Sequence, residues 1–544
     1  MNVLPPRLHP LLFPLTVLLV FIVYGRSLNG GFVFDDHHFV ENNQSIRTLK
    51  NAARFFSDPS TQSSHEGLNT GIYRPLATLS FAADYAIAGL NPAYSRAVNL
   101  LLHCCNTLLV VYLGMLLGFS GLYAALMGAF FALFPTNVES FVWISGRSAA
   151  LSTALILCAV ICFIKNAKSG RTKYLRLASL FTIAALFTRE TAVVIPLLAL
   201  AYLAAGRLPV KKHLFAVGTY LALPAGSFLL LRSLLLGRLQ QAPPPDLPLS
   251  TLVSVPFLLF AKYVDIMLYP FSMLVTYTDS INARISAFWF YFPFAIAVFL
   301  LYSGLTAVLR ARGERIAAWG LLWVLISLLP VLNIVSMTIY AAERLAYLPL
   351  VGLAMVVAAA ARGLAGKGVP RKTVLAAFCV LFILFTVNIQ ARMRVWRDDV
   401  SLWRYDAEKN PRNFLTRLRL AEALRAAGEL PEAHAALIRA LDLASNDGQR
   451  AIACNELGTS YAVSGDLEKA ERFFRASVEL NPGGYLGLYN LGKVCAMRRD
   501  IAAARKYLGR SLELNGEYVP ARELEASLRN GTFRGKPAGG PPVK

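Results

Sequence analysis

Long apolar stretches separated by short polar segments fill the chain up to about residue 391. Most of these stretches approach the ~20 residues that an α-helix needs to cross the hydrocarbon layer of a membrane. The pattern therefore predicts eleven membrane-spanning helices. They are expected at residues 8–25, 94–118, 120–135, 148–164, 174–187, 190–206, 213–236, 288–309, 316–335, 345–361 and 373–391.

Basic residues are concentrated in the segments that follow the fourth, sixth, eighth and tenth predicted spans, for example Lys211, Lys212 and Lys372. Such segments lie on the cytoplasmic side of membrane proteins. All four segments share that side if the N-terminus is cytoplasmic. The odd-numbered junctions and the C-terminal region are then predicted to lie on the opposite, external side.

The segment 251–269 is also apolar, but a full crossing there would move Arg310 and Arg312 to the external side. The segment carries Lys262 and Asp265, and charged side chains are costly in lipid. We therefore predict a re-entrant or interfacial helix at this position.

Beyond about residue 395 the apolar pattern becomes that of short amphipathic helices with an internal repeat. Gly458 recurs as Gly492, and Ala470 recurs as Ala504, both after 34 residues. An earlier copy lies 37 residues upstream. A 34-residue period of paired helices, with small residues where the helices cross, is typical of tetratricopeptide (TPR) repeats.

The composition agrees with a membrane protein. Hydrophobic residues make up 56% of the chain and charged residues 16%, against roughly 45–50% and about 25% in soluble proteins. These values exclude a purely soluble globular protein and an intrinsically disordered chain, and seven cysteines are too few for a disulfide framework. The sequence predicts an all-α protein in three parts: a polytopic membrane helical bundle at 1–395, a TPR α-solenoid at 396–530 and a disordered tail at 531–544.

Acidic residues and arginines recur together at four predicted external segments. These are the long loop 26–93, the loop 136–147, and the junctions between spans five and six and between spans nine and ten. Ionisable groups at the membrane edge are functional candidates by default. The candidates are Asp35, Asp36, Arg74, Glu139, Arg147, Arg189, Glu190, Glu343 and Arg344.

Each candidate also has a purely structural interpretation. Asp35 and Asp36 could cap a turn, and at most one of two adjacent residues in an extended segment is expected to touch a substrate. The acid–arginine neighbours at the last two junctions could be local ion pairs, and Arg147 could extend to lipid headgroups. His37 and His38 lack a third spaced ligand, so no metal site is predicted.

Short motifs stand in order along the external segments, and together they resemble the start and the junctions of a known family. They are Gly31–Asp36, Tyr73–Leu76, Gly89–Pro92, Val98–His103, Phe134–Glu139, Trp143–Arg147, Arg189–Ala192 and Ala342–Pro349. With the repeats, they make essentially the whole chain similar to the transmembrane-and-TPR-containing O-mannosyltransferases.

This resemblance implies a GT-C-like bundle of about eleven helices, because the family belongs to the GT-C glycosyltransferases. These enzymes use polyprenyl-phosphate sugars on the non-cytoplasmic face. The family usually has His-Pro-x-His-Thr-Glu where this chain has Phe134–Glu139, so the histidines are missing and Glu139 is kept. Arg189-Glu190 stands where the family usually has Lys-Glu.

The implied reaction matches the candidate residues. A polyprenyl monophosphate leaving group is already an anion and needs only positive charge, for which the planar guanidinium is suited. The acceptor hydroxyl needs a carboxylate base on the opposite face of the sugar, and one displacement inverts the anomeric centre. We predict Asp35 or Asp36 as the base with support from Glu139, a phosphate clamp of Arg147, Arg189 and Arg344, a lesser contribution from Arg74, and supporting roles for Glu190 and Glu343.

The predicted activity is the transfer of a mannose-like hexose from a polyprenyl-phosphate sugar to a protein or glycan hydroxyl, with the TPR repeats recruiting the acceptor. Membrane lipid is an expected partner and nucleic acid is not. No cofactor is predicted as required. Two alternatives stay open: a ligase of diphosphate-linked glycans, for which a divalent metal is more plausible, and a non-catalytic membrane-anchored TPR scaffold for envelope assembly. The expected location is a bacterial inner membrane with a periplasmic site and repeats, or the endoplasmic reticulum membrane with a lumenal TPR region in a eukaryote.

Overall fold

The computed structural model describes residues 12–64, 71–237, 249–271, 274–277, 281, 285, 287–335 and 341–533. Within these ranges every regular element is a helix, which confirms the all-α prediction. The chain divides into two compact units, Met1–Asp398 and Asp399–Lys544. The predicted disordered tail at 531–544 falls almost wholly outside the described residues.

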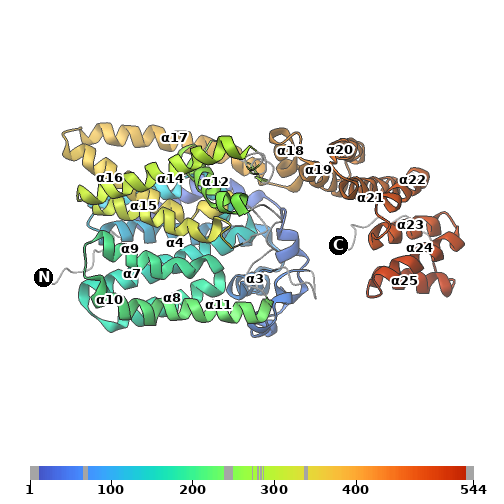
Figure 1. The fold of residues 1–544 in the computed structure, drawn as a ribbon, viewed down its shortest axis with the longest axis horizontal. Coiled ribbons are helices and arrows are strands. Elements are labelled where there is room, and N and C mark those ends of the chain that lie inside the picture. Colours follow the sequence, from blue (N-terminus) through green and yellow to red (C-terminus); the bar gives the residue numbers. More distant parts are fainter. Residues whose placement is uncertain are drawn as a thin grey trace. The chain divides into compact units, whose positions relative to one another are not determined.

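The first unit is a bundle whose long helices lie side by side, most of them roughly parallel or antiparallel (Figure 1). Short helical turns connect them, and four of the nine candidate residues lie in these turns: Glu139, Glu190, Glu343 and Arg344. The main helices are α1 (Leu12–Tyr24), α3 (Pro75–Ala88), α4 (Pro92–Leu116), α5 (Gly121–Ala132), α7 (Arg147–Ser169), α8 (Thr172–Thr188), α9 (Ile195–Ala205), α10 (Val210–Val217), α11 (Leu223–Leu236), α12 (Leu249–Leu268), α14 (Phe288–Ala311), α15 (Arg315–Leu328), α16 (Pro349–Gly366) and α17 (Arg371–Val395).

A helix overlies each of the eleven predicted spans. Among the described residues, six helices are long and apolar enough to cross a membrane, or seven if the bent pair Gly121–Ala132 and Pro135–Phe141 is one span. Shorter apolar helices at Pro14–Asn29, Glu190–Ala205 and Arg315–Val331 overlap three other predicted spans. Those three spans, the span over α8 and the interfacial placement of α12 stay predictions.

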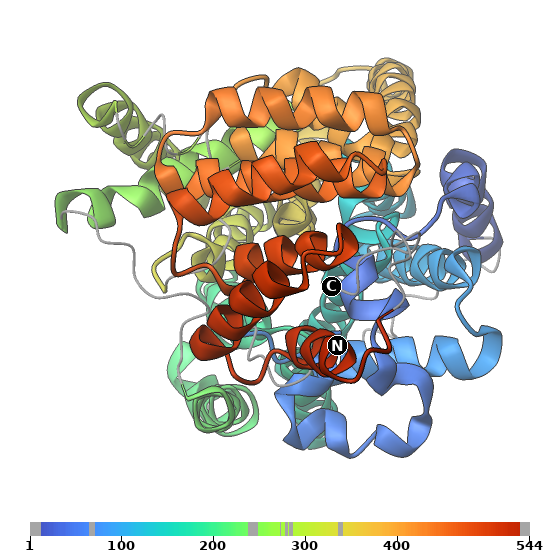
Figure 2. The ribbon, with the colours of Figure 1, turned by 90° about the vertical axis from the view of Figure 1, so that its right-hand side faces the viewer.

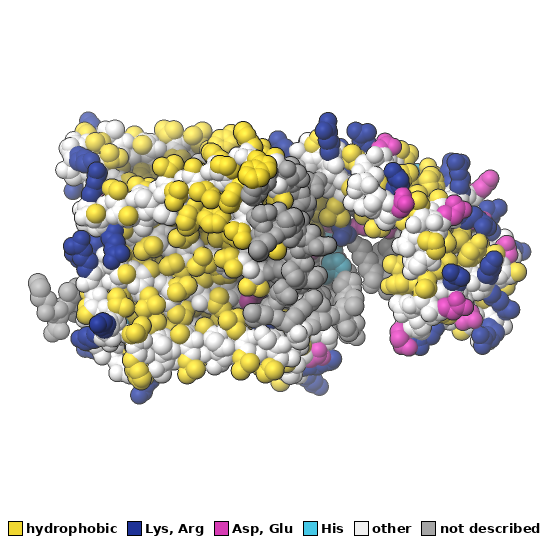
Figure 3. All heavy atoms as spheres, viewed as in Figure 1, with side chains coloured by type: hydrophobic (Ala, Val, Ile, Leu, Met, Phe, Trp, Pro, Cys, Tyr) yellow, Lys and Arg dark blue, Asp and Glu magenta, His cyan; other side chains and the backbone are white. Residues whose placement is uncertain are grey.

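The surface of the first unit has the charge distribution of a membrane bundle. In Figure 3, Lys and Arg side chains cluster at the left-hand end of this unit and apolar side chains cover its flank. The described helix α14 shows the flank most clearly, because only 6% of its apolar window is buried inside the protein. An apolar flank that ends in basic residues is the pattern expected of helices embedded in lipid.

The predicted external loop 26–93 contains several short helical turns and one longer helix, α3. Helix α3 begins at Pro75, a residue favoured at the first helical position, and it buries Phe81, Ala82 and Asp84. Helix α3 was not predicted, and the place of the segment outside the membrane spans stays a prediction.

Helices α15 and α16 approach each other most closely at a pair of glycines. A Cβ atom added to Gly320 would lie 2.6 Å from the carbonyl oxygen of Gly352, and one added to Gly352 would collide with the carbonyl of Gly320. Small residues at such crossings let two membrane helices pack backbone to backbone.

Replacing Gly352 by Ala is expected to destabilise the protein by about 1–3 kcal/mol, because an overpacked contact forces backbone shifts. Gly363→Ala is the matched control on the same helix, since a Cβ at Gly363 meets nothing within 4 Å. Thermal unfolding in detergent measures both changes. Equal unfolding temperatures for the two variants would contradict the close-packing argument.

The second unit is a succession of helical hairpins (Figures 1 and 2). Asp466 and Asp500, 34 residues apart, each cap the second helix of a pair by accepting a hydrogen bond from a backbone N–H three residues on, at 3.1 and 3.0 Å. Gly458 packs against the ring of Phe474, where a Cβ would lie 2.7 Å from a ring carbon. Such paired helices are the units of TPR arrays. The helices are α18 (Asp399–Lys409), α19 (Phe414–Ala426), α20 (Leu430–Leu443), α21 (Asp447–Val463), α22 (Leu467–Leu480), α23 (Tyr485–Met497), α24 (Ile501–Leu514) and α25 (Val519–Arg529).

Candidate active site

Helix α4 carries a stripe of buried polar side chains toward the candidate loops. Arg96, Asn99, His103 and Asn106 recur at intervals of three or four residues, so they share one helix face. The Asn99 side-chain amide donates to the Phe141 carbonyl at 3.0 Å. The stripe therefore fixes the loop 136–147 to the helix. His103 is a packed polar residue, since its Nδ1 lies 2.7 Å from the hydroxyl of Tyr347.

Asp36 is fully buried and joins the first external loop to the loop 136–147. Its Oδ1 accepts hydrogen bonds from the backbone N–H and the hydroxyl of Ser145 at 2.8 and 2.5 Å, and its Oδ2 accepts one from the backbone N–H of Val33 at 3.1 Å. Burial raises the pKa of Asp36 to about 6, although the hydrogen bonds from Ser145 oppose this shift. Both carboxylate oxygens are therefore occupied by the protein.

Asp35 lies on the tip of the same turn and is half-buried. Its carbonyl accepts hydrogen bonds from the backbone N–H groups of His38 and Phe39 at 3.0 and 2.9 Å. The preceding residue, Phe34, has a φ of 58°, a left-handed conformation that is strained for a bulky side chain. Phe34 also lies against the ring of Trp143, with centroids 5.8 Å apart. Asp35 therefore lies at the tip of a strained turn.

Two carboxylates at the external junctions pair with arginines from distant segments. Glu190 receives two hydrogen bonds from Arg74, at 2.7 and 3.1 Å. Glu139 accepts the backbone N–H of Arg344 at 3.0 Å and forms an ion pair with its guanidinium. That guanidinium also lies 4.9 Å from the ring centre of Trp143. Both ion pairs join residues that are far apart in the sequence. The structural alternative had instead paired each acid with the arginine next to it in the sequence.

Glu343 also has a distant partner. It forms a buried ion pair with Arg392 of α17 and accepts a hydrogen bond from the hydroxyl of Tyr277 at 3.2 Å. A second nitrogen of Arg392 donates to the carbonyl of Pro270 at 2.7 Å. Glu343 therefore ties its junction to α17 and to the segment after α12.

Arg147 is fully buried, and each nitrogen of its guanidinium donates hydrogen bonds to neighbouring groups of the bundle. Its Nε donates to Asn99 at 2.6 Å, and its Nη1 donates to the carbonyl of Ser80 at 3.2 Å. Its Nη2 donates to the Asp84 carboxylate at 2.5 Å and to the carbonyl of Ser95 at 2.9 Å. Arg147 does not line the cavity that Arg189 and Arg344 share. These contacts favour a structural part for Arg147 over the predicted phosphate contact or an extension to headgroups.

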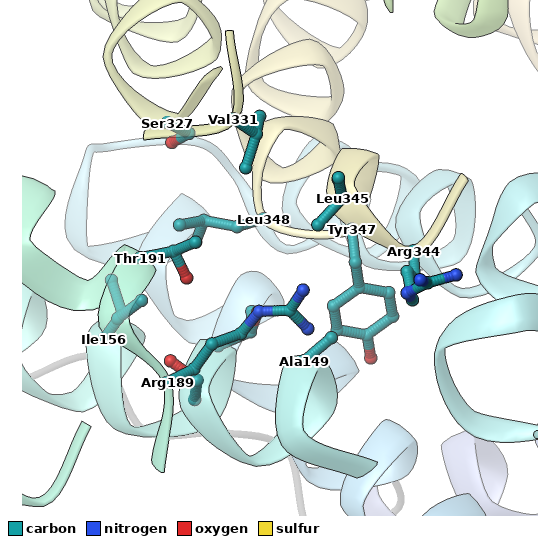
Figure 4. A pocket seen from close by; sticks show the side chains of 12 residues that line it. Ala149, Ile156, Arg189, Thr191, Ser327, Val331, Arg344, Leu345, Tyr347 and Leu348 are labelled. Atoms are coloured by element: carbon teal, nitrogen blue, oxygen red, sulfur yellow. The ribbon is translucent and has the colours of Figure 1, made fainter. Parts of the chain in front are cut away.

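The side chain of Arg189 lines a small cavity (Figure 4). Arg189 itself has few hydrogen-bond partners. Its Nη1 donates weakly to the hydroxyl of Ser148 at 3.4 Å, and it forms no ion pair with a carboxylate in the described ranges. Burial lowers its pKa to about 9, the guanidinium of Arg74 acts in the same direction, and the carboxylate of Glu190 opposes this shift. Arg189 is therefore a buried cation at neutral pH that forms no ion pair with a carboxylate among the described residues.

The cavity around Arg189 is lined by both apolar and polar side chains, and its space of about 20 Å³ suits one water molecule. Figure 4 shows the guanidinium extending between Thr191, Leu348 and Tyr347. Among the described residues, the buried hydroxyls of Ser152 and Ser327 have no hydrogen-bond partner. A phosphate group requires this cavity to widen. The lining comprises Ala149, Ser152, Thr153, Ile156, Arg189, Thr191, Ser327, Val331, Arg344, Leu345, Tyr347 and Leu348.

The two histidines beside the aspartates have other partners in the structure. His37 pairs with Glu41, and His38 lies 3.3 Å from the hydroxyl of Ser64. In the part of the chain that the structure describes, no three His, Cys, Asp or Glu side chains gather as a metal site would require.

Sequence reasoning missed the partners of the candidates: Asp84, Arg96, Trp143 and Arg392. Arg96 could have been found from its place on the polar stripe of α4, and Arg392 from its place near the end of an apolar span. Asp84 gave no such signal, because it was placed in a loop.

No model of a known protein family matches the chain. The chain is 32% identical over 180 residues to protein O-mannosyl-transferase Tmtc1 of Drosophila melanogaster. This match covers 32% of this chain and 20% of the Drosophila protein. The chain is 34% identical over 152 residues to TMTC1 of Mus musculus (27% and 16%) and 32% identical over 146 residues to TMTC2 of Homo sapiens (26% and 17%). The chain spans about a fifth of the length of these relatives. Over about a third of its own length, it is similar to the transmembrane and TPR-containing protein O-mannosyl-transferases, as its motifs predict.

Proposed function

We propose that the protein is an inverting membrane glycosyltransferase that moves a mannose-like hexose from a polyprenyl-phosphate donor to a hydroxyl of a protein acceptor. The names of the similar proteins support the transfer of mannose to protein. The predicted topology supports a site on the non-cytoplasmic face, and the repeats of the second unit are suited to hold a peptide acceptor.

The observation that carries this proposal is that the buried Arg189 forms no ion pair with a described carboxylate. Glu190, Glu139, Asp84 and Glu343 each form an ion pair with another arginine, whereas Arg189 forms no ion pair with a described carboxylate. A buried charge without a partner costs several kcal/mol, which an arriving anion would offset. A monophosphate or a diphosphate link would each bring such an anion, so the choice of the monophosphate donor rests on the resemblance to the O-mannosyltransferases.

Asp35 is the better assignment for the base. The oxygens of Asp36 are bound by Ser145 and Val33, and Asp36 is fully buried, whereas Asp35 is half-buried on the turn tip. In the reaction, the acceptor hydroxyl gives its proton to the carboxylate as its oxygen bonds to the anomeric carbon. The bond from that carbon to the phosphate oxygen breaks, and polyprenyl phosphate leaves beside Arg189 and Arg344.

The direct test uses the full chain in lipid nanodiscs with radiolabelled polyprenyl-phosphate mannose, the matching diphosphate-linked sugar and a Ser/Thr-rich acceptor peptide. We expect labelled peptide with the monophosphate donor and inversion at the anomeric carbon. Turnover of the diphosphate donor alone would point to the ligase alternative, and no turnover of either would leave the scaffold alternative.

The donor KM should depend on pH through Arg189. Its pKa of about 9 means that the cation is lost as the pH rises through that value, so the donor KM should be flat from about pH 6 to 8 and then rise roughly tenfold per pH unit. The KM profile of Arg189→Gln should be raised throughout and lack this step. The acceptor KM, measured in parallel, is the control. A step of the same size in Arg189→Gln would contradict the assignment.

A further inference from the structure

Arg96 binds three carbonyl groups, two from the segment that enters the first external loop and one from the segment that follows α17. Its Nη1 donates to Ser27 at 2.9 Å, and its Nη2 donates to Gly31 at 2.6 Å and to Trp396 at 3.3 Å. The side chain is 1% exposed. A guanidinium can bridge several acceptors at fixed angles, and an ammonium cannot reproduce that arrangement.

The turn that carries Asp35 is anchored on both sides of its tip. On one side, the carbonyl of Gly31 accepts a hydrogen bond from Arg96. The backbone N–H of Gly31 donates to the carbonyl of Arg397 at 3.0 Å. On the other side, Asp36 is bound to Ser145. The tip between these anchors contains Phe34, whose left-handed backbone is strained. Strain of this kind persists only where the surroundings fix it.

We propose that Arg96 is a positioning residue that holds the Gly31–Asp36 turn in the conformation that presents Asp35 for proton transfer. This inference rests on the proposed function, because it assigns a task to the same carboxylate. Arg96 lies beneath the turn on α4 and is bound to backbone groups, so it acts through the turn. A small displacement of a catalytic group lowers turnover by up to about 100-fold.

Gly30 offers a way to disturb this contact without changing Arg96. A Cβ at Gly30 would collide with the Arg96 guanidinium, while the Gly30 backbone (φ −83°, ψ 155°) accepts any residue. Gly30→Ala should therefore displace the guanidinium from its carbonyl partners. Gly25→Ala is the matched control, because a Cβ there meets nothing within 4 Å.

The experiment compares wild type, Gly30→Ala, Arg96→Lys and Gly25→Ala as full chains in nanodiscs, after size-exclusion selection of folded protein. For Gly30→Ala and Arg96→Lys we expect kcat to fall about 10- to 100-fold with the donor KM within about twofold. We also expect faster hydrogen exchange at the amides of 34–39. Gly25→Ala should match wild type in both measurements.

The outcomes separate this inference from the proposed function. Wild-type kcat and exchange in Gly30→Ala and Arg96→Lys would overturn the role of Arg96 while leaving the transferase proposal intact. Equal losses in kcat and in donor affinity would indicate a general structural defect and would also overturn it. If wild type transfers no sugar, the transferase proposal fails, and unchanged exchange in the variants would then refute the anchoring of the turn independently.

Discussion

Asp35→Asn is expected to lower kcat for sugar transfer by about 10²–10⁴-fold, the usual contribution of a general base. The amide has nearly the same shape as the carboxylate but cannot take the proton of the acceptor hydroxyl. Donor binding depends on the cation of Arg189 instead, so the donor KM should change little. Single-turnover transfer from labelled polyprenyl-phosphate mannose in nanodiscs measures the chemical step directly.

Asp36→Asn is the matched control one residue away. Its new amide faces the N–H of Val33 and the donors of Ser145, and at least one of these loses its acceptor. A buried donor without an acceptor costs about 1–3 kcal/mol, so this variant should lower thermal stability more than Asp35→Asn does. Its kcat per folded molecule should exceed that of Asp35→Asn. Full activity in both variants would remove the acidic pair from the mechanism, and the reverse order would move the base to Asp36.

The helices were largely predictable because apolar runs have visible ends. The span predicted at 94–118 corresponds to α4, which begins at Pro92 and ends just before Gly118. The bend of 52° after α5 coincides with Pro135, which lacks an N–H group and interrupts the helix. Helix α3 was missed because it is short, so its apolar residues did not reach the length of a span.

The site residues were easier to predict than their partners. Acids and arginines mark the external junctions in the sequence, but nothing in their spacing says which arginine meets which acid. Glu139 and Arg344 are 205 residues apart, and Arg74 and Glu190 are 116 apart. Only the packing of the bundle decides these pairs. It also pairs Glu190 with Arg74 and leaves Arg189, its neighbour in the sequence, without an ion pair among the described residues.

Arg147→Met is expected to destabilise the first unit by about 3–5 kcal/mol, because it leaves the buried carboxylate of Asp84 without its cation. The Asp84 side chain is only 9% exposed, and Arg147 is not exposed at all. Methionine keeps the apolar volume of the stem above Phe81, whose ring lies 4.7 Å from the guanidinium. Thermal unfolding in detergent and the donor KM are both measured on the same preparation. Together they distinguish a structural role of Arg147 from a contact with the donor phosphate.

Asp84→Asn and the double variant complete the argument. If the pair is structural, removing both charges should recover much of the stability lost by Arg147→Met, since no buried charge then lacks a partner. The donor KM of folded Arg147→Met should stay within about twofold of wild type, because Arg147 contacts Asn99, Asp84 and Ser95 rather than the Arg189 cavity. An unchanged unfolding temperature together with a donor KM raised tenfold would instead restore Arg147 to the phosphate clamp. The site would then need a rearrangement that opens α3 away from α7, and the close fit of Asp84 to Arg147 argues against that.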